Sequence, residues 1–294
     1  PSISQLVKNI EYTIGAPLFD RTTQPIKLTP VGIAYYEAAK KIENVNRELQ
    51  NRVSEINDLQ FGTLTIGTSP FRAACMLPKS IAYFKEKYPG ISINIISEPI
   101  EILKQYLLDG NIENDVFQPQ FFSSESLSTE TFYLAVNPSN PWNEGKEKNV
   151  LTADDILQDS EKLYDDCTVS AAEAEKLPFI LLDSKNEYQD LSANIFENLN
   201  MKPDITLRAS NIETKFHWVT SNLGAGFIPD TLIRFGNFKE HPNYYKIREP
   251  KRSGQLFQEE IVVAYNKHHF LTKAAKEYII ELKKLIGLGT WLTA

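Results

Sequence analysis

The spacing of the apolar residues changes at Gly62, and this change constrains the fold more than any other feature of the sequence. A helical pattern runs over 31–60, in which single apolar side chains recur at steps of three or four from Ile42 onward and mostly Lys, Glu, Asn, Arg and Gln lie between them. After Gly62 the pattern alternates, as in "TLTIGTS", and strand-like and helix-like segments then follow one another. The sequence therefore predicts one long helix followed by an α/β unit.

The apolar residues of the long helix form a narrow stripe, which consists of Ile42, Val45, Leu49, Val53, Ile56 and Leu59. A stripe of this width is typical of a coiled-coil seam, whereas a helix that faces a core carries a broader one. Because a seam needs a partner, we predict that the chain dimerises through this helix. Packing of the helix against its own domain is the alternative.

The residues before this helix predict a DNA-binding motif. Residues 3–14 have the pattern of an amphipathic helix, and Gly15 follows as a left-handed cap. The stretch "APLFDRTTQPIKLTP" then predicts a turn and a small hairpin. A helix, a turn and a hairpin in this order suggest a winged helix-turn-helix, in which the helix enters the major groove and the hairpin contacts the DNA backbone or the minor groove.

Two groups of polar residues are candidates for contact with DNA. They lie on the polar face of the helix and in the hairpin, and they are Ser2, Ser4, Gln5 and Lys8, then Arg21, Thr22, Gln24 and Lys27. Arg21 and Lys27 would hold phosphates, which contribute affinity rather than sequence recognition. For each helix residue a solvated position without DNA contact is equally plausible. Arg21 could instead pair with Glu11 or another local carboxylate.

The part after Gly62 alternates between strands and helices. Strands are expected at "TLTIGTS", "GISINIIS", "NDVFQ", "TFYLAVN", "LPFILLD", "ITLRAS", "GAGFIP" and "EIVVAYN". This alternation predicts a largely parallel sheet, and the last helix is expected at 272–286. Two helix starts carry capping signals, namely Ser69 before Pro70, and Thr152 with Asp155 three residues later.

Ligands of open α/β sheets bind beyond the carboxyl ends of the strands, near helix N-termini. The residues at these ends outline a cleft for a small molecule, and they are Thr68, Ser69, Phe71, Glu98, Pro99, Gln118, Asp183, Ser184, Ser210, Asn211, Phe227 and Pro229. Each of them alone is more often structural, and a helix cap explains Ser69 equally well. Since hydroxyls, amides and an aromatic ring come together here, a small polar organic acid is the expected ligand.

Composition and motifs exclude several classes of protein. The net charge of -7 argues against a chain that coats nucleic acid with its whole surface, although a local basic patch is compatible with it. Membrane spans and the common catalytic and cofactor-binding motifs are absent from the sequence, so we expect a cytoplasmic protein that is not an enzyme and holds no cofactor and no metal. Cys75 fits a buried inert thiol, and Cys167 lies in an acidic context that raises a thiol pKa, so no redox switch is expected.

Four segments resemble the LysR-type transcriptional regulators. They are the stretch from "PSISQLVKN" to "LTPVG", with "G-x-P-L-F-x-R" and "L-T-P-x-G" signatures; "GTLTIGTS" with "MLPKSIAYFKEKYPGISINI"; "LLDGNIENDVF"; and "SNIETKFHWVTSNLGAGFIP". The resemblance implies an α/β protein with a partial winged helix-turn-helix at 1–30, a linker and dimerisation helix at 31–61, and a two-lobed, periplasmic-binding-protein-like effector domain at 62–294. Lobe I would comprise about 62–122 and 257–294, and lobe II about 123–256.

The resemblance also implies partners and a mechanism. Members of the family usually assemble as homotetramers, bind operator DNA, and respond to a small-molecule effector between the lobes. The effector would change the lobe angle and with it the placement of the DNA-binding heads.

Two departures from the family pattern concern the DNA contacts. The family commonly has Arg at the positions of Gln5 and Gln24, so a less basic DNA footprint that favours A·T pairs is expected. The first helices of the motif would precede "PSISQLVKN", so we expect this stretch to be its second half. The alternative function is a two-lobed solute-binding protein without a DNA role. Such a protein would need neither the hairpin nor the coiled-coil seam.

Overall fold

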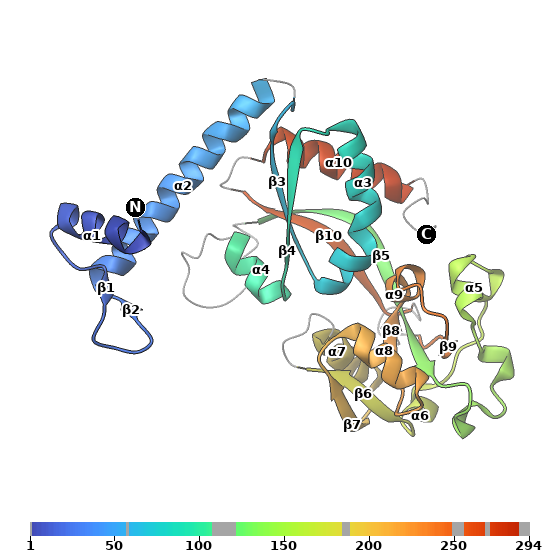
Figure 1. Cartoon of the computed structure of the whole chain (residues 1–294). Coiled ribbons are helices and arrows are strands. Elements are labelled where there is room, and N and C mark those ends of the chain that lie inside the picture. The colour runs from blue at the N-terminus through green and yellow to red at the C-terminus, as the bar shows by residue number, and fades with distance from the viewer. Residues whose placement is uncertain are drawn as a thin grey trace. The chain divides into compact units, whose positions relative to one another are not determined.

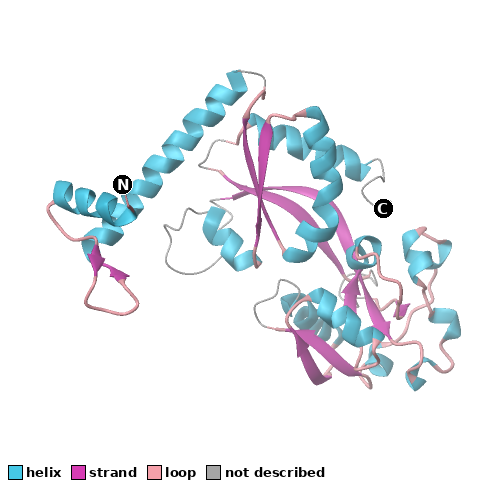
Figure 2. Cartoon of the chain, in the orientation of Figure 1, coloured by secondary structure: helices cyan, strands magenta, loops and turns pink. Residues whose placement is uncertain are grey.

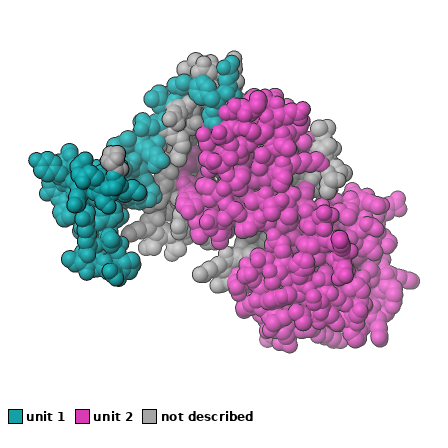
Figure 3. Space-filling model, in the orientation of Figure 1, with its two compact units in different colours: residues 1–62 teal, residues 63–294 magenta. Residues whose placement is uncertain are grey.

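The computed structural model describes residues 2–56, 59–107, 122–183, 189–248, 256–267 and 271–287. The chain divides into two compact units, Pro1–Gly62 and Thr63–Ala294, which Figure 3 distinguishes by colour. Figures 1 and 2 identify the helices and strands of each unit.

The first unit contains a short helix, a small hairpin and a long helix. Helix α1 (Ile3–Ile14) ends at Gly15, which has the predicted left-handed conformation. Strands β1 (Phe19–Asp20) and β2 (Lys27–Leu28) pair antiparallel, and helix α2 (Pro30–Ile56) follows. The order of elements predicted for this part of the sequence is therefore the order in the structure.

A glycine allows the start of α2 to approach the hairpin. The Gly32 N–H donates to Thr29 Oγ1 at 2.9 Å, and the Thr29 hydroxyl donates to the Pro17 carbonyl oxygen at 2.7 Å. A Cβ atom at Gly32 would lie 2.0 Å from the carbonyl oxygen of Leu18, so a larger residue would displace the backbone. This contact explains why "PLF" and "LTPVG" occur together.

The second unit has two lobes, and the first lobe is a strand pair covered by helices (Figure 1). Its elements in chain order are β3 (Gly62–Thr68), the π-helical turn η1 (Arg72–Met76), α3 (Leu77–Lys87), β4 (Ile91–Ser97), α4 (Ile100–Leu107) and α10 (Lys273–Gly287). Helix α10 packs on α3, where the Ser80 and Tyr278 hydroxyls lie 2.6 Å apart and Lys87 Nζ pairs with Glu281 Oε1 at 2.7 Å. The C-terminal helix thus completes a lobe that begins near residue 62.

The second lobe is built around two groups of strands. Its strands are β6 (Pro178–Leu182), β7 (Asp204–Ala209), β8 (Gly226–Pro229) and β9 (Asn243–Tyr245). Strand β6 pairs with β7, whereas β8 and β9 pair with β5 (Phe122–Val136). Its helices are α5 (Ala153–Leu157), α6 (Ala171–Ala174), α7 (Gln189–Leu199), α8 (Ile212–Thr220) and α9 (Asp230–Phe235). The rings of Phe179, Phe196 and Phe227 pack together in its core, with centroids 5.0 to 6.0 Å apart.

Two long strands, β5 (Phe122–Val136) and β10 (Gln258–Asn266), connect the lobes (Figure 2). Strand β5 pairs antiparallel with β10 up to Thr131, and from Phe132 onward it pairs antiparallel with β8 and β9. Strand β5 therefore changes partners between Thr131 and Phe132. This point is the crossover between the lobes.

The structure confirms most of the expected elements and corrects three features. The capping box of Thr152 and Asp155 is present as predicted. The largely parallel sheet is wrong, because β5 is antiparallel to each of its three partners, while β6 and β7 are parallel. The strand expected at "TFYLAVN" begins at Phe122, and α6, α9 and β9 were not expected. The strand expected at "NDVFQ" lies outside the described residues.

Candidate functional site

The ends of β3 and β4 lie side by side in the first lobe. The Glu98 N–H donates to the Thr68 carbonyl oxygen at 3.2 Å, so Thr68 and Ser69 are neighbours of Glu98 and Pro99. The sequence expected these four residues at two separate strand ends. The structure brings them together at one edge of the strand pair.

Ser69 is the unusual member of this group. Its Oγ is shielded from solvent and makes no hydrogen bond to the described residues, while its carbonyl oxygen accepts from the Ala73 N–H at 2.9 Å. The helical segment therefore begins at Pro70, directly after Ser69 as predicted, but the Ser69 hydroxyl makes no capping bond within that segment. A buried hydroxyl without a partner is unfavourable, and a π-helical turn, here three residues further on, is frequent at functional sites. Both observations favour a ligand-binding role for this edge.

Three of the apolar candidates, namely Phe71, Phe227 and Pro229, are buried. A Cβ atom at Gly226 would lie 2.5 Å from Cε of Lys215, so the glycine of the "GAGFIP" segment lets β8 run close to that lysine.

Lys215 on α8 is a buried residue that the sequence did not single out. Its side chain is 1% exposed, and its Nζ donates to the Phe227 carbonyl oxygen at 2.9 Å. Burial lowers its pKa from the ordinary 10.5 to about 7. Lys215 therefore links α8 to β8.

The start of α8 carries two of the candidate residues of the second lobe, Ser210 and Asn211. Asn211 caps the helix, because its Oδ1 accepts from the Thr214 N–H at 2.8 Å, and its Nδ2 donates to Ser210 Oγ at 3.4 Å. Glu213, two residues further, lies close enough to Cys75 of the first lobe to raise the thiol pKa, after burial as the larger cause. Glu213 at the start of α8 and Cys75 in the helical turn after Ser69 are therefore within electrostatic range of one another, one in each lobe. Gln118 and Ser184 lie outside the described residues.

The candidate DNA-contacting residues of the first unit are exposed. On α1 these are Ser2, Ser4, Gln5 and Lys8, and in the hairpin they are Arg21, Thr22, Gln24 and Lys27. Gln5 donates to Asn9 Oδ1 at 3.2 Å, and the Thr22 hydroxyl donates to Asp20 Oδ1 at 2.6 Å. The alternative for Arg21 is present in the structure, since its Nη2 lies 3.3 Å from Glu11 Oε2.

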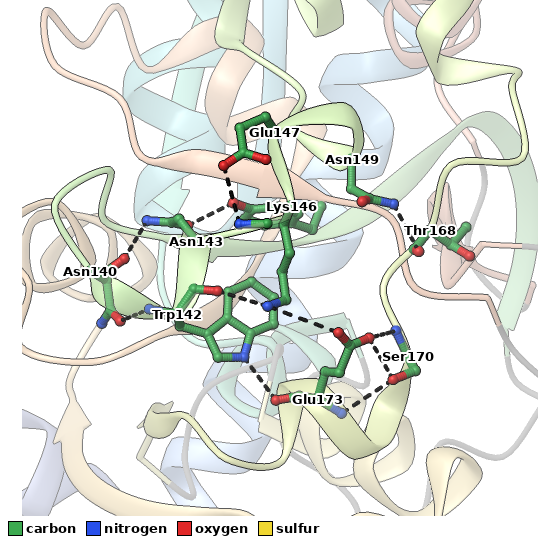
Figure 4. A network of polar contacts seen from close by, with 11 residues as sticks. Asn140, Trp142, Asn143, Lys146, Glu147, Asn149, Thr168, Ser170 and Glu173 are labelled. Carbon is green, nitrogen blue, oxygen red and sulfur yellow. Dashed lines mark hydrogen bonds and ion pairs between the residues drawn. The ribbon is translucent and has the colours of Figure 1, made fainter.

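A separate polar network fastens the surface of the second lobe (Figure 4). The Trp142 indole donates to the Glu173 carbonyl oxygen at 2.8 Å, and Lys146 Nζ lies 4.4 Å from the centre of the Trp142 ring. Ser170 and Glu173 form a capping box at the start of α6. Because these groups bond one another, the network acts as a fastening between residues 140–149 and 168–173.

Comparison with known proteins decides the family. The family model described as the LysR substrate binding domain matches residues 57–286. The chain belongs to the LysR family of transcriptional regulators. A probable RuBisCO transcriptional regulator of Nostoc sp. is 23% identical over 99% of this chain and 82% of its own length. The HTH-type transcriptional regulator BsdA of Bacillus subtilis is 26% identical over 79% of this chain and 75% of its own length.

Solved structures of LysR regulators share the fold. Full-length OxyR from Pseudomonas aeruginosa, a cysteine variant, has a TM-score of 0.63 at 18% identity, over 98% of this chain and 86% of that one. A Corynebacterium glutamicum OxyR mutant has a TM-score of 0.60 at 19% identity, over 99% and 85%. The α/β effector domain predicted from the sequence is therefore confirmed as that of the LysR family.

Membership in the LysR family establishes the functional class of the chain. The chain is a regulator of the ligand-responsive type, and its relatives are transcriptional regulators, which is consistent with a protein that is not an enzyme. The rival interpretation, a solute-binding protein without a DNA role, has no support among these relatives. Within the described ranges, no helix is both long and apolar enough to cross a membrane.

Proposed function

We propose that this LysR regulator binds a small polar effector in the cleft between the two lobes of its second unit. The observation that supports the site most strongly is the buried hydroxyl of Ser69, which makes no hydrogen bond to the described residues. An effector that bonds this hydroxyl would remove an unfavourable feature of the free protein. Thr68, Glu98 and Pro99 would line the same side.

The opposite side of the cleft would come from the second lobe. Ser210 and Asn211 are exposed at the start of α8, and Glu213 is near enough to influence Cys75. A hydroxyl, an amide and backbone N–H groups suit a ligand with carbonyl or carboxyl oxygens. We propose a small organic acid, and a matched set of acids, amides and amines tests this class.

Two further proposals concern the first unit. We infer that α1 and the β1–β2 hairpin act as part of a winged helix-turn-helix on operator DNA, since their exposed polar residues include Lys8 and Lys27. We infer also that α2 pairs with a second copy of the chain, because Ile42, Val45 and Leu49 are 60 to 65% exposed. Tetramers would require a second contact between such dimers.

The effector proposal is tested by thermal shift against the library of acids, amides and amines, followed by titration of any compound that raises the melting temperature. The variant Ser69→Ala should bind that compound roughly tenfold more weakly, about 1.4 kcal/mol, because one hydrogen bond is lost. Ser139→Ala, at an exposed position of the second lobe, is the matched control. Unchanged affinity in Ser69→Ala would remove Ser69 from the site.

The DNA proposal is tested by anisotropy with labelled promoter fragments at increasing salt. The logarithm of the binding constant should fall linearly with the logarithm of salt concentration. Replacing Lys27 by Ala should reduce that slope by about 1 if Lys27 contacts a phosphate. Binding that does not respond to salt would contradict the DNA role of this unit.

A further inference from the structure

The crossover between the lobes carries a side-chain bridge. Glu130 lies on β5, one residue before the last residue of that strand to pair with β10, and its side chain is 2% exposed. Its Oε1 lies 2.8 Å from Nη2 of Arg72, in the first lobe. Its Oε2 accepts from the Thr231 hydroxyl at 2.6 Å, in the second lobe. One buried carboxylate is therefore held by both lobes, and we call these three residues the inter-lobe bridge.

The backbone at the crossover is fastened by a second carboxylate. The Thr131 N–H donates to Asp230 Oδ1 at 3.0 Å, and Asp230 lies at the start of α9 beside Thr231. Arg234, one turn later on α9, has its Nε 3.5 Å from Asp230 Oδ2. Asp230 therefore holds α9 to β5 at the point where β5 changes partners. The first turn of α9 is thus fixed to the crossover, and the bridge joins it to the first lobe through Arg72.

We propose that the inter-lobe bridge sets the angle between the two lobes of the free protein. A strand pair that changes partners can bend at the change, and buried charged hydrogen bonds with fixed geometry oppose such bending. Glu130 can keep these two bonds together only over a narrow range of relative positions of η1 and α9. Loss of either bond removes a contact that holds this buried carboxylate to one of the lobes, so the lobe angle is less firmly fixed.

The bridge also has a route to the cleft. Arg72 lies three residues after Ser69, in the helical segment over 70–87 that Ser69 directly precedes. An effector that draws Ser69 toward α8 would move the start of this segment and with it the guanidinium that holds Glu130. This part of the inference rests on the proposed effector site, whereas the role of the bridge in the free protein does not.

Distance measurements by pulsed electron paramagnetic resonance test the bridge without an effector. Spin labels at Glu86→Cys on α3 and Glu197→Cys on α7 report the separation of the lobes, in a chain of residues 1–294 that also carries Cys75→Ser and Cys167→Ser. Labelled chain is co-refolded with a large excess of unlabelled chain, so that distances between copies do not contribute. The parent chain should give one narrow distance distribution.

Three variants remove parts of the bridge, and one variant serves as the control. Arg72→Gln and Thr231→Val each remove one bond, and Glu130→Gln removes the charge while keeping the shape. Each should shift and broaden the distance distribution. Lys87→Gln breaks an ion pair of 2.7 Å with the buried Glu281 inside the first lobe, so it should lower the melting temperature and leave the distribution unchanged.

The outcomes separate the bridge from the effector site. Folded bridge variants with the parent distribution would overturn the proposal, as would an equal change in Lys87→Gln. If Glu130→Gln does not fold, Thr231→Val decides, because this near-isosteric change removes a single hydroxyl. A failed search for effectors would leave the distance result standing, whereas an effector that binds without altering the distance in the parent chain would refute the link from the cleft to the bridge.

Discussion

Replacing Lys215 by methionine should make the protein more stable at neutral pH, although it removes a hydrogen bond. Lys215 is 1% exposed, and its Nζ donates to the Phe227 carbonyl oxygen. Burial lowers its pKa from 10.5 to about 7 in the folded state. Methionine has a similar length and no charge, so it fits the space between α8 and β8 without the cost of burying an amine.

The direction of the pH dependence follows from the protons bound in each state. Below pH 7 both states hold the proton, and the folded state carries the full cost of burying it. Between about pH 7 and 10.5 the unfolded chain keeps the proton and the folded chain loses it, so stability rises with pH by about 1.4 kcal/mol per unit. Over this window the free energy of unfolding of the wild type rises by roughly 3 to 5 kcal/mol. The lost bond to the Phe227 carbonyl oxygen costs about 1 to 3 kcal/mol. The free energy of unfolding of Lys215→Met at pH 7 should therefore exceed that of the wild type by about 1 to 3 kcal/mol.

Urea unfolding of both proteins at pH 7.5, 8.5 and 9.5 measures this difference. The free energy of unfolding of the wild type should climb relative to that of Lys215→Met, and the advantage of the variant should shrink as the pH rises. Lys202→Met, at an exposed position of the same lobe, is the control and should follow the wild type. Parallel pH profiles for wild type and Lys215→Met would refute the idea that the buried amine loses its proton in this range.

Three further predictions concern stability and assembly. Ser69→Ala should unfold at the same or a slightly higher urea concentration than the wild type, because it removes a buried hydroxyl that makes no hydrogen bond to the described residues; a loss above about 1 kcal/mol would contradict this. Ser170→Ala should cost about 1 kcal/mol in urea unfolding, because it removes the capping box of α6, and an unchanged midpoint would contradict that role. Leu49→Glu on α2 should halve the mass of the assembly in light scattering, while Lys40→Glu on the opposite side of the helix should leave it unchanged; an unchanged mass in both would show that the apolar stripe is not the interface.

The sequence predicts those parts of the fold that depend on local patterns. Helix α1 with its left-handed Gly15 and the Thr152 capping box follow from the spacing and identity of a few neighbouring residues. Apolar runs such as Pro178–Leu182 and Gly226–Pro229 likewise mark buried strands. For such segments burial and hydrogen bonding within the element agree with the pattern, so the prediction holds.

Local sequence patterns do not predict the crossover strand β5. Its first half, "FSSESLST", is polar and alternates weakly, because it pairs with β10 along a face that is only partly covered. Nothing local indicates that Thr131 ends one pairing and Phe132 begins another. The antiparallel direction of β5 also depends on a segment that returns from residues 258–266, so it is a property of the whole unit.

Residue type alone does not show which candidate side chains are available to a ligand. The hydrogen bonds in the structure do show it. Asn211 and Arg21 carry suitable chemistry, yet in the structure the first caps α8 and the second pairs with Glu11, so each already has a structural role. Ser69 carries the same kind of hydroxyl that caps α6 at Ser170, but its Oγ makes no hydrogen bond to the described residues. Residue type places all of these in the same class, whereas the hydrogen-bond partners separate them. A polar atom that is buried and makes no bond to the described residues has the strongest reason to bind something else, so Ser69 is the first residue to change in a search for the effector.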